Sequence, residues 1–210
     1  MLELIAVTRQ FEGRRVLGPL DLRVEPGERV VLFGRSGCGK TTALRIIAGL
    51  TPPDNGQVIL NGQIVSEPGR VILPPERRGI GYVFQDLALW PHMTIAANIE
   101  FPLKVRGVPA AERQEQTMKL LGLLELPNRA SAFPANLSGG EQQRVAIARA
   151  LAGSPRAVLM DEPMANLDDE LRHTLSGVLL RLQEKLGFAI VAVTHRNDEI
   201  AMLSARRVAL

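Results

Sequence analysis

The order of apolar and polar residues along the chain predicts two kinds of β-strand. Residues 2–8 and 20–24 alternate apolar and polar side chains, which is typical of strands with one buried face. The segment 58–65 carries Asn61 and Gly62 at its centre, and this dipeptide favours a tight hairpin turn. These segments predict a small antiparallel sheet near the N-terminus.

Four other segments are apolar almost without interruption: 30–33, 82–84, 157–160 and 189–193. Strands that are covered on both faces, as in a parallel α/β sheet, have this composition. The residues that follow these runs are polar or open a glycine-rich loop: Gly34, Gln85, Asp161, Glu162, Thr194 and His195. Ligands of open α/β sheets bind beyond the carboxyl ends of the strands. The pattern therefore predicts that four separate segments deliver polar groups to one edge of a sheet.

Residues 86–136 have a different pattern. Residues 110–121 have the period of a helix, and Pro109 suits its first position. Further prolines divide the rest of the region: Pro91, Pro102, Pro127 and Pro134. We predict a mostly helical inserted subdomain at 86–136 and an α/β core formed by 1–85 and 137–210.

Composition restricts the classes of function. The 210 residues include 25 basic and 22 acidic side chains, for a net charge of +3. No block of basic residues stands out, so we expect no nucleic-acid partner. The single cysteine, Cys38, cannot form an internal disulfide, which fits a reducing compartment. Residues 1–5 include an acid and lack a basic leader, which predicts no signal peptide. No apolar run approaches the ~20 residues that span a bilayer.

Residues 34–41 match the phosphate-binding pattern Gly-x-x-x-x-Gly-Lys-Thr, after an apolar run and before a segment suited to a helix. Its glycines let backbone N–H groups turn inward around phosphates, and the helix N-terminus adds positive potential. Lys40 supplies a cation, and the Thr41 hydroxyl is suited to ligate Mg²⁺. Cys38 is interpreted as a small filler in the loop, with a reactive thiol as the alternative. The residues predicted to bind the nucleotide here are Gly34, Arg35, Ser36, Gly37, Cys38, Gly39, Lys40, Thr41 and Thr42.

Asp161 and Glu162 follow an apolar run that resembles a Walker B strand. Asp161 is placed to hold Mg²⁺ through water, and Glu162 to polarise an attacking water. The alternative is a pair of acids that cap a loop, and the phosphate-binding loop in the same chain favours the catalytic interpretation. A positioned general base contributes on the order of 10²–10⁴ in rate.

The segment Leu137-Ser138-Gly139-Gly140-Glu141 has two compatible interpretations. Ser138 with Glu141 three residues later predicts a capping box for a helix that continues to Leu151. Two consecutive glycines weaken a helix start, but they leave backbone amides bare at a positive helix end, where an anion can bind.

The phosphate-binding loop, the Ser-Gly-Gly segment and the Asp-Glu pair, in this order, resemble the nucleotide-binding subunit of ATP-binding-cassette (ABC) transporters. The resemblance covers nearly the whole chain. It implies an α/β P-loop NTPase with a mostly parallel sheet, an N-terminal antiparallel sheet and an inserted helical subdomain. It also implies an ATPase that uses ATP and Mg²⁺. Two copies would clamp two ATP molecules in a homodimer, with Ser138, Gly139 and Gly140 facing the loop of the partner.

The resemblance implies roles for four more residues. Gln85 would contact Mg²⁺ or the attacking water, and His195 the γ-phosphate. Asp168, within residues 165–168, would lie at the subunit interface, and Phe11 would stack on adenine. The ordinary alternatives stay open: a surface glutamine, a structural histidine, a helix cap and a core phenylalanine.

Residues 85–94 resemble importer-type members of the family, notably those for sugars, polyamines, sulfate or iron. Phe84, Leu89 and Trp90 are candidates to line a groove for a short helix of a membrane subunit, and burial inside the helical subdomain is the alternative. The implied partners are transmembrane permease subunits and, through them, a solute-binding protein. The implied location is peripheral, on the cytoplasmic face of the cell membrane. A soluble ABC ATPase without a transport role and an exporter-type ATPase are the alternatives.

Three departures from the family pattern stand out. Arg35 occupies a position where proline is frequent, and Arg196 one where an acid is usual. Residues 206–210 predict a strand, and the closing hairpin of the family is missing after it, which is expected of a truncated chain.

Overall fold

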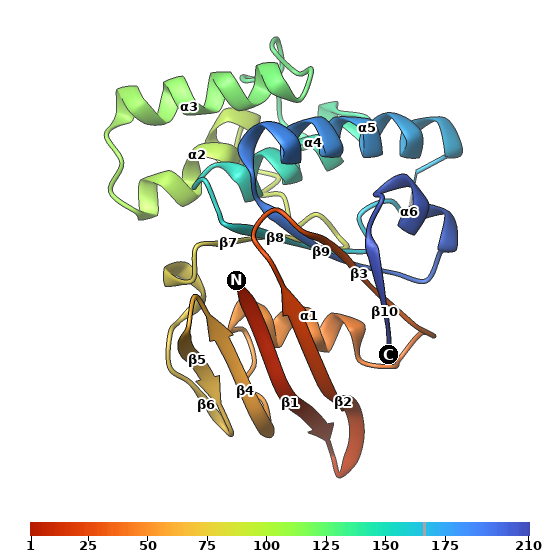
Figure 1. Cartoon of the computed structure of the whole chain (residues 1–210). Coiled ribbons are helices and arrows are strands. Elements are labelled where there is room, and N and C mark those ends of the chain that lie inside the picture. The colour runs from red at the N-terminus through yellow and green to blue at the C-terminus, as the bar shows by residue number, and fades with distance from the viewer. Residues whose placement is uncertain (166) are drawn as a thin grey trace.

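The computed structural model describes residues 1–165 and 167–210, and these form two five-stranded sheets (Figure 1). The antiparallel sheet has the strand order β2-β1-β4-β5-β6. Its strands are β1 (Leu2–Phe11), β2 (Arg14–Val24), β4 (Asn55–Leu60), β5 (Gln63–Glu67) and β6 (Arg70–Val71). The parallel sheet has the order β10-β3-β9-β8-β7. Its strands are β3 (Arg29–Phe33), β7 (Ile80–Val83), β8 (Ala157–Asp161), β9 (Ala189–Thr194) and β10 (Arg206–Ala209).

The antiparallel sheet confirms the hairpin and extends the first two strands. Asn61 and Gly62 have φ angles of 49° and 80°, and Leu60 pairs with Gln63, so the turn has the geometry that the Asn-Gly pair predicts. Strands β1 and β2 are longer than the alternating segments 2–8 and 20–24. Register irregularities in β1 interrupt the alternation of buried positions. The alternation pattern therefore predicted both strands to be shorter than they are.

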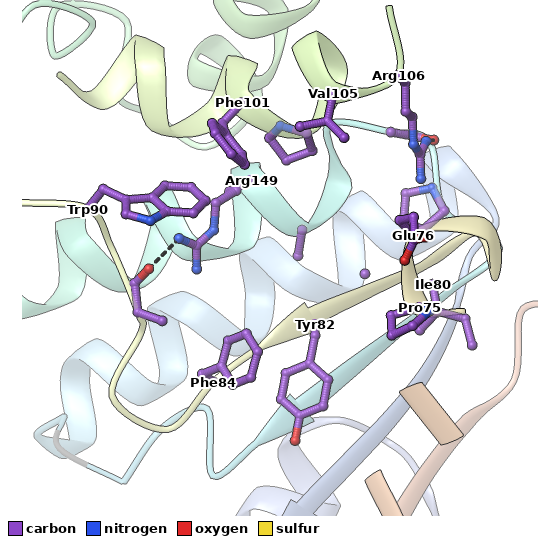
Figure 2. A pocket seen from close by; sticks show the side chains of 16 residues that line it. Pro75, Glu76, Ile80, Tyr82, Phe84, Trp90, Phe101, Val105, Arg106 and Arg149 are labelled. Carbon is purple, nitrogen blue, oxygen red and sulfur yellow. Dashed lines mark hydrogen bonds between the residues drawn. The ribbon is translucent and has the colours of Figure 1, made fainter. Parts of the chain in front are cut away.

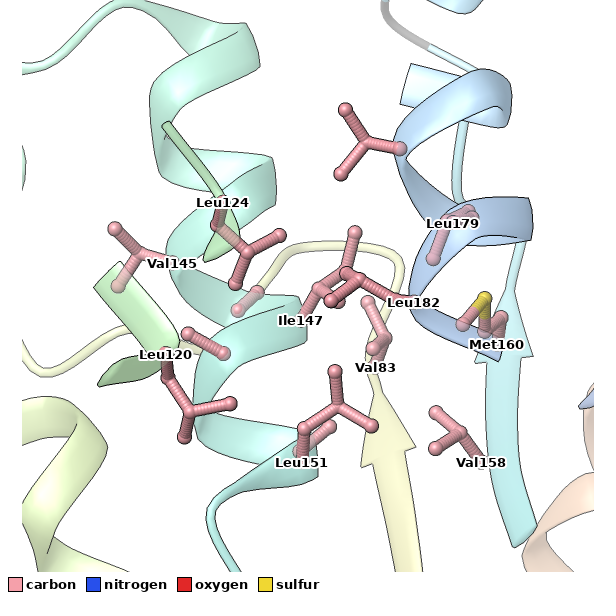
Figure 3. Packing of buried hydrophobic residues seen from close by; sticks show 14 of the residues in the cluster. Val83, Leu120, Leu124, Val145, Ile147, Leu151, Val158, Met160, Leu179 and Leu182 are labelled. Atoms are coloured by element: carbon pink, nitrogen blue, oxygen red, sulfur yellow. The ribbon is translucent and has the colours of Figure 1, made fainter. Parts of the chain in front are cut away.

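The parallel sheet has a buried core on each face, which explains its continuous apolar strands. On β3, Val30 and Leu32 face the core beneath α1 (Lys40–Ala48), whereas Val31 faces the opposite core. The opposite core is covered by α4 (Gly139–Leu151) and α5 (Asp169–Leu186). Figure 3 shows this packing, in which side chains from α4 and α5 meet residues of β7 and β8.

The segment between β7 and α4 contains α2 (Ile95–Val105), α3 (Ala110–Leu123) and the short 3-10 turn Pro134–Asn136. Another 3-10 turn, Pro75–Arg77, precedes β7, and α6 (Asn197–Met202) precedes β10. The helix expected at 110–121 is present, but Pro109 lies at its N-cap position, one residue before its first position. Pro102 lies inside α2, although the sequence placed it among residues that interrupt structure. The packing of α2 against neighbouring helices overrides the tendency of proline to interrupt a helix. The subdomain boundaries at 86 and 136 stay a prediction.

Candidate functional site

The carboxyl ends of the parallel strands β7, β8 and β9 and the loop after β3 open onto one cavity of about 490 Å³. Segments far apart in the chain therefore meet at one edge of the sheet. The cavity is lined by Val16, Ser36, Gly37, Gly39, Lys40, Thr41, Thr42, Gln85, Glu162 and His195.

The glycine-rich loop between β3 and α1 requires its glycines for different reasons. Gly37 and Gly39 have φ angles of 78° and 97°, a left-handed conformation that favours glycine. A Cβ at Gly39 would also collide with the Val16 carbonyl oxygen, so the loop packs directly on β2. A Cβ at Gly34 would lie 2.6 Å from the Cys38 Sγ. Cys38 therefore fills space inside the loop, as its interpretation as a filler requires.

Lys40 and the start of α1 make the loop suited to an anion. The Lys40 side chain is buried, and its Nζ donates to the carbonyl oxygens of Gly34 and Arg35 at 2.8 and 2.9 Å. Over its described length, α1 has no acidic residue in its first turn and no side chain that caps its N-terminus. The amides there are free for a ligand, and the helix dipole adds positive potential. The side chain of Arg35, within the loop, is exposed.

Asp161 is a buried carboxylate at the end of β8. Its Oδ1 accepts a hydrogen bond from the Thr41 hydroxyl at 2.9 Å, and its Oδ2 lies 3.4 Å from the Tyr82 hydroxyl. Burial raises the pKa of Asp161 above its ordinary value, because the charged form has lost solvation. Sequence reasoning missed Tyr82, whose side chain reaches Asp161 from the neighbouring strand β7.

These oxygen donors fit Mg²⁺. Thr41 lines the cavity together with Gln85. The Thr41 hydroxyl is also hydrogen-bonded to Asp161. Hydroxyl, carboxylate and amide oxygens are ligands that hard divalent cations accept. Within residues 1–165 and 167–210, no three His, Cys, Asp or Glu side chains cluster as a metal site. An ion here would therefore complete its coordination with phosphate oxygens and water, as Mg²⁺ commonly does.

Glu162 and His195 form a contact at the cavity. The His195 Nδ1 lies 3.3 Å from the Glu162 Oε1. Glu162 has a φ of 47°, and its N–H donates to the Val193 carbonyl at 3.1 Å. A left-handed conformation is costly for a residue other than glycine, and such strain is concentrated at functional sites. After His195, the Arg196 guanidinium donates to both carboxylate oxygens of Asp198, at 3.1 and 2.8 Å. The unusual positive charge after His195 is therefore paired.

Five predicted site residues that lie outside the glycine-rich loop and the ends of the parallel strands do not line this cavity. Phe11 is half exposed at the end of β1, with the Arg9 guanidinium 5.1 Å from its ring centre. Ser138, Gly139 and Gly140 lie at the start of α4, and Asp168 caps α5 by accepting from the Leu171 N–H at 2.8 Å. Asn166, which the sequence places in the same interface loop, lies outside the described residues. The roles of these residues toward a nucleotide stay predictions.

Ser138 forms the predicted capping box. Its Oγ accepts from the Glu141 N–H at 3.3 Å, and the Glu141 carboxylate accepts from the Ser138 N–H at 2.8 Å. We expect Ser138→Ala to lower the free energy of unfolding by about 1 kcal/mol, because a buried helix loses its cap. Urea titration measures this loss, with the exposed Ser131→Ala as the matched control. Equal stability of the two variants would contradict the structural role of the cap.

A second cavity, of about 520 Å³, lies between β7, α2 and α4 (Figure 2). Phe84, Trp90 and Phe101 line it, together with Tyr82 and Arg149. Phe84 and Trp90 therefore line a groove, as one of the two interpretations of this region expected. Leu89 does not line it and instead packs on the core of the parallel sheet, which corrects its assignment to the groove.

A glycine-rich loop that joins a central parallel strand to a helix defines the class of P-loop nucleotide-binding proteins. The family model described as "ABC transporter" matches residues 17–165. The chain therefore belongs to the ABC transporter family.

Curated relatives support this assignment over nearly the full chain. The spermidine/putrescine import ATP-binding protein PotA of Nitrosospira multiformis is 46% identical over 206 residues, which are 98% of this chain and 55% of that protein. PotA of Marinobacter nauticus is 43% identical over 210 residues, which are 100% of this chain and 55% of that protein. The chain thus spans about half the length of these relatives.

Solved structures support the fold. A dimeric structure of the ATP-binding cassette MJ0796 in a post-hydrolysis state, bound to ADP and Pi, superposes with a TM-score of 0.85 at 32% identity. The match covers 100% of this chain and 94% of that one. This confirms the predicted α/β architecture with its antiparallel sheet. None of the helices in the described parts of the chain combines the length and apolarity needed to cross a membrane.

Proposed function

We propose that this chain is the ATP-hydrolysing subunit of an ABC transporter and drives import through separate membrane subunits. The observation that carries the proposal is the meeting of Lys40, Thr41, Gln85, Glu162 and His195 around one cavity. A phosphate-binding loop alone indicates nucleotide binding, whereas an acid and a histidine that line the same cavity add the groups that hydrolysis needs.

The residues of the cavity have distinct proposed roles. The loop amides and Lys40 bind the phosphates, while Thr41, Asp161 and Gln85 hold Mg²⁺. When bound, Mg²⁺ neutralises charge on the phosphate oxygens. Glu162 polarises the attacking water, and its 3.3 Å contact with His195 keeps the two side chains on the same side of the cavity. His195, whose side chain is 57% exposed, is free to contact a γ-phosphate.

A second copy of the chain is proposed to complete each site. Ser138 and Gly139 are exposed at the start of α4 and do not line the cavity of their own chain. The Ser138 N–H is engaged by the Glu141 carboxylate, so the groups proposed to meet the nucleotide of a partner are the Gly139 amide and the Ser138 hydroxyl. The arrangement would be two-fold, with each copy serving the other. Phe11, half exposed, is proposed to stack on adenine, and Asp168 to lie at the interface. The dimeric state of the related MJ0796 cassette supports this arrangement.

The membrane partners are proposed to dock in the aromatic groove of Figure 2. Phe101 and Val105 are exposed at its rim, and aromatic side chains are favoured anchors at interfaces. Transmembrane permease subunits would place this chain peripherally on the cytoplasmic face of the membrane, with a solute-binding protein linked only through them. The names of the relatives support import over export, and polyamines as the solute.

The dependence of phosphate release on protein concentration tests the proposal. If each site needs two copies, the rate per chain should rise with concentration and reach a plateau once the dimer is saturated. Phosphate release from purified protein at saturating Mg²⁺ and ATP measures this rate. A full rate per chain at concentrations where only monomer is present would refute the composite site. No release at any concentration would refute the ATPase function.

A further inference from the structure

Arg149, on the last turn of α4, binds the loop that follows Gln85. Its side chain is buried in the protein, and its guanidinium donates from Nη1 to the Ala88 carbonyl at 2.5 Å and from Nη2 to the Leu87 carbonyl at 2.7 Å. The same guanidinium lies 5.0 Å from the centre of the Trp90 ring (Figure 2). One side chain thus contacts three nearly consecutive residues of a distant loop, with its two hydrogen bonds spanning 61 and 62 positions in the sequence.

The loop that Arg149 holds is strained. Leu87 and Ala88 have φ angles of 60° and 45°, and residues other than glycine keep such a conformation only where the surroundings impose it. The planar guanidinium presents two donors at once, which matches the two adjacent carbonyls. Burial lowers the pKa of Arg149, because the charged guanidinium has lost solvation.

The two ends of α4 face different parts of the molecule. Its first residues, Ser138 to Gly140, are those proposed to meet the nucleotide of the partner. Its last turn carries Arg149, which contacts Leu87, Ala88 and Trp90. This segment begins two residues after Gln85 of the nucleotide cavity and includes Trp90 of the aromatic groove. A rigid helix can transmit a displacement from its first residues to the loop at its other end, provided that the loop is held firmly against the helix.

We propose that Arg149 is a positioning residue that makes α4 and the loop 86–90 move together. A shift of α4 on contact with the partner then moves Gln85 in the cavity and Trp90 in the groove. This inference rests on the proposed function, because it assigns the connection between the ATP site and the docking surface.

Trp90 is the only tryptophan of the chain, so its fluorescence reports directly on this contact. We expect Mg²⁺-ATP to change the emission of Trp90 in the unaltered protein, and Arg149→Met to abolish that change. We also expect Arg149→Met to lower kcat about tenfold and to alter KM for ATP less than about threefold, since a positioning contact is lost and the phosphate contacts remain. A purely stabilising arginine would leave both the fluorescence response and kcat of the folded variant unchanged.

Two further variants sharpen the test. Ala88→Gly removes the strain at one of the two left-handed residues, so we expect it to restore part of kcat when combined with Arg149→Met. Arg149→Lys retains the charge without the planar fork, so we expect an intermediate kcat, and it carries the test if Arg149→Met does not fold. The matched control is Arg113→Met on α3, which removes an arginine that donates to the Val108 carbonyl at 2.6 Å outside both cavities. It should retain kcat and the fluorescence response.

The outcomes separate the two proposals. In the Glu162→Gln background we expect ATP to bind while hydrolysis is slowed by about 10²- to 10⁴-fold, so the Trp90 response can be measured apart from hydrolysis. A missing response in protein that binds ATP overturns the positioning role, as does a full response together with normal kcat in Arg149→Met. An absence of hydrolysis in the unaltered protein overturns the proposed ATPase; a Trp90 response that is then present in the unaltered protein and lost in Arg149→Met still supports the role of Arg149.

Discussion

Replacing Glu162 with glutamine should lower the rate of ATP hydrolysis by about 10²- to 10⁴-fold, the range that removal of a positioned general base produces. Glutamine retains the length of the side chain and an oxygen that can meet His195, so the cavity keeps its shape. Only the negative charge that polarises water is lost. The strained backbone at Glu162, with its φ of 47°, holds the glutamine in the same direction.

ATP binding should survive this change, because the phosphate contacts assigned to Lys40 and the loop are untouched. The variant should therefore accumulate as an ATP-dependent dimer, which light scattering or gel filtration with ATP can detect. Phosphate release gives the rate, and Glu184→Gln on the exposed surface of α5 is the matched control. If the hydrolysis rate of Glu162→Gln were within about threefold of the control rate, Glu162 would not be the general base.

Much of the fold could be predicted from the sequence, because the parallel strands are buried on both faces. Consecutive residues of β8 face opposite cores, with Leu159 toward α1 and Met160 toward α5. Each position is therefore apolar, and the strand is visible without knowledge of its neighbours. The same reasoning located the polar residues beyond the strand ends. Local pattern could not give the full lengths of β1 and β2, since irregular register interrupts their alternation.

The parts of the site that were not predicted depend on contacts between distant segments. Tyr82 reaches Asp161 over 79 positions, and Arg149 reaches Ala88 over 61. Neither residue has a neighbour in sequence that indicates its partner. Asn98 is a further example, because its buried side chain holds the Trp90 carbonyl at 3.1 Å and the Trp90 N–H at 2.8 Å. A tyrosine in a strand or an asparagine in a helix has too many ordinary roles for sequence to select one.

Arg78 is the strongest case of a buried contact that sequence does not reveal. It lies 6% exposed beneath the end of α1, without a carboxylate within salt-bridge distance among the described residues. Its guanidinium donates to one side-chain oxygen and four carbonyl oxygens: Ser66 Oγ, Leu73, Ile46, Ile47 and Val65. Burial lowers the pKa of Arg78 to about 10, so the group remains charged at neutral pH.

Two of these carbonyls, those of Ile46 and Ile47, belong to the last turn of α1, where carbonyl groups run out of helical N–H partners. The Ile46 carbonyl also accepts from the Gly49 N–H at 3.0 Å, so the Ile47 carbonyl depends more on Arg78. The cation also meets the negative end of the helix dipole. Gly49 leaves the space for it, since a Cβ there would lie 2.5 Å from the Arg78 Nε. Because the phosphate-binding loop opens the same helix, Arg78 secures the far end of the element that carries Lys40 and Thr41.

Replacing Arg78 with methionine should lower the free energy of unfolding by about 3–5 kcal/mol, because several buried acceptors lose their donor. Urea unfolding followed by circular dichroism measures the loss. The neighbouring Arg77 is exposed, so Arg77→Met should cost less than about 0.5 kcal/mol. Arg78→Lys should fall between the two, since one ammonium cannot reach five acceptors around a planar fork. If Arg78→Met were no less stable than Arg77→Met, the carbonyls at the end of α1 would have to be satisfied by other groups, and Arg78 would not secure the helix.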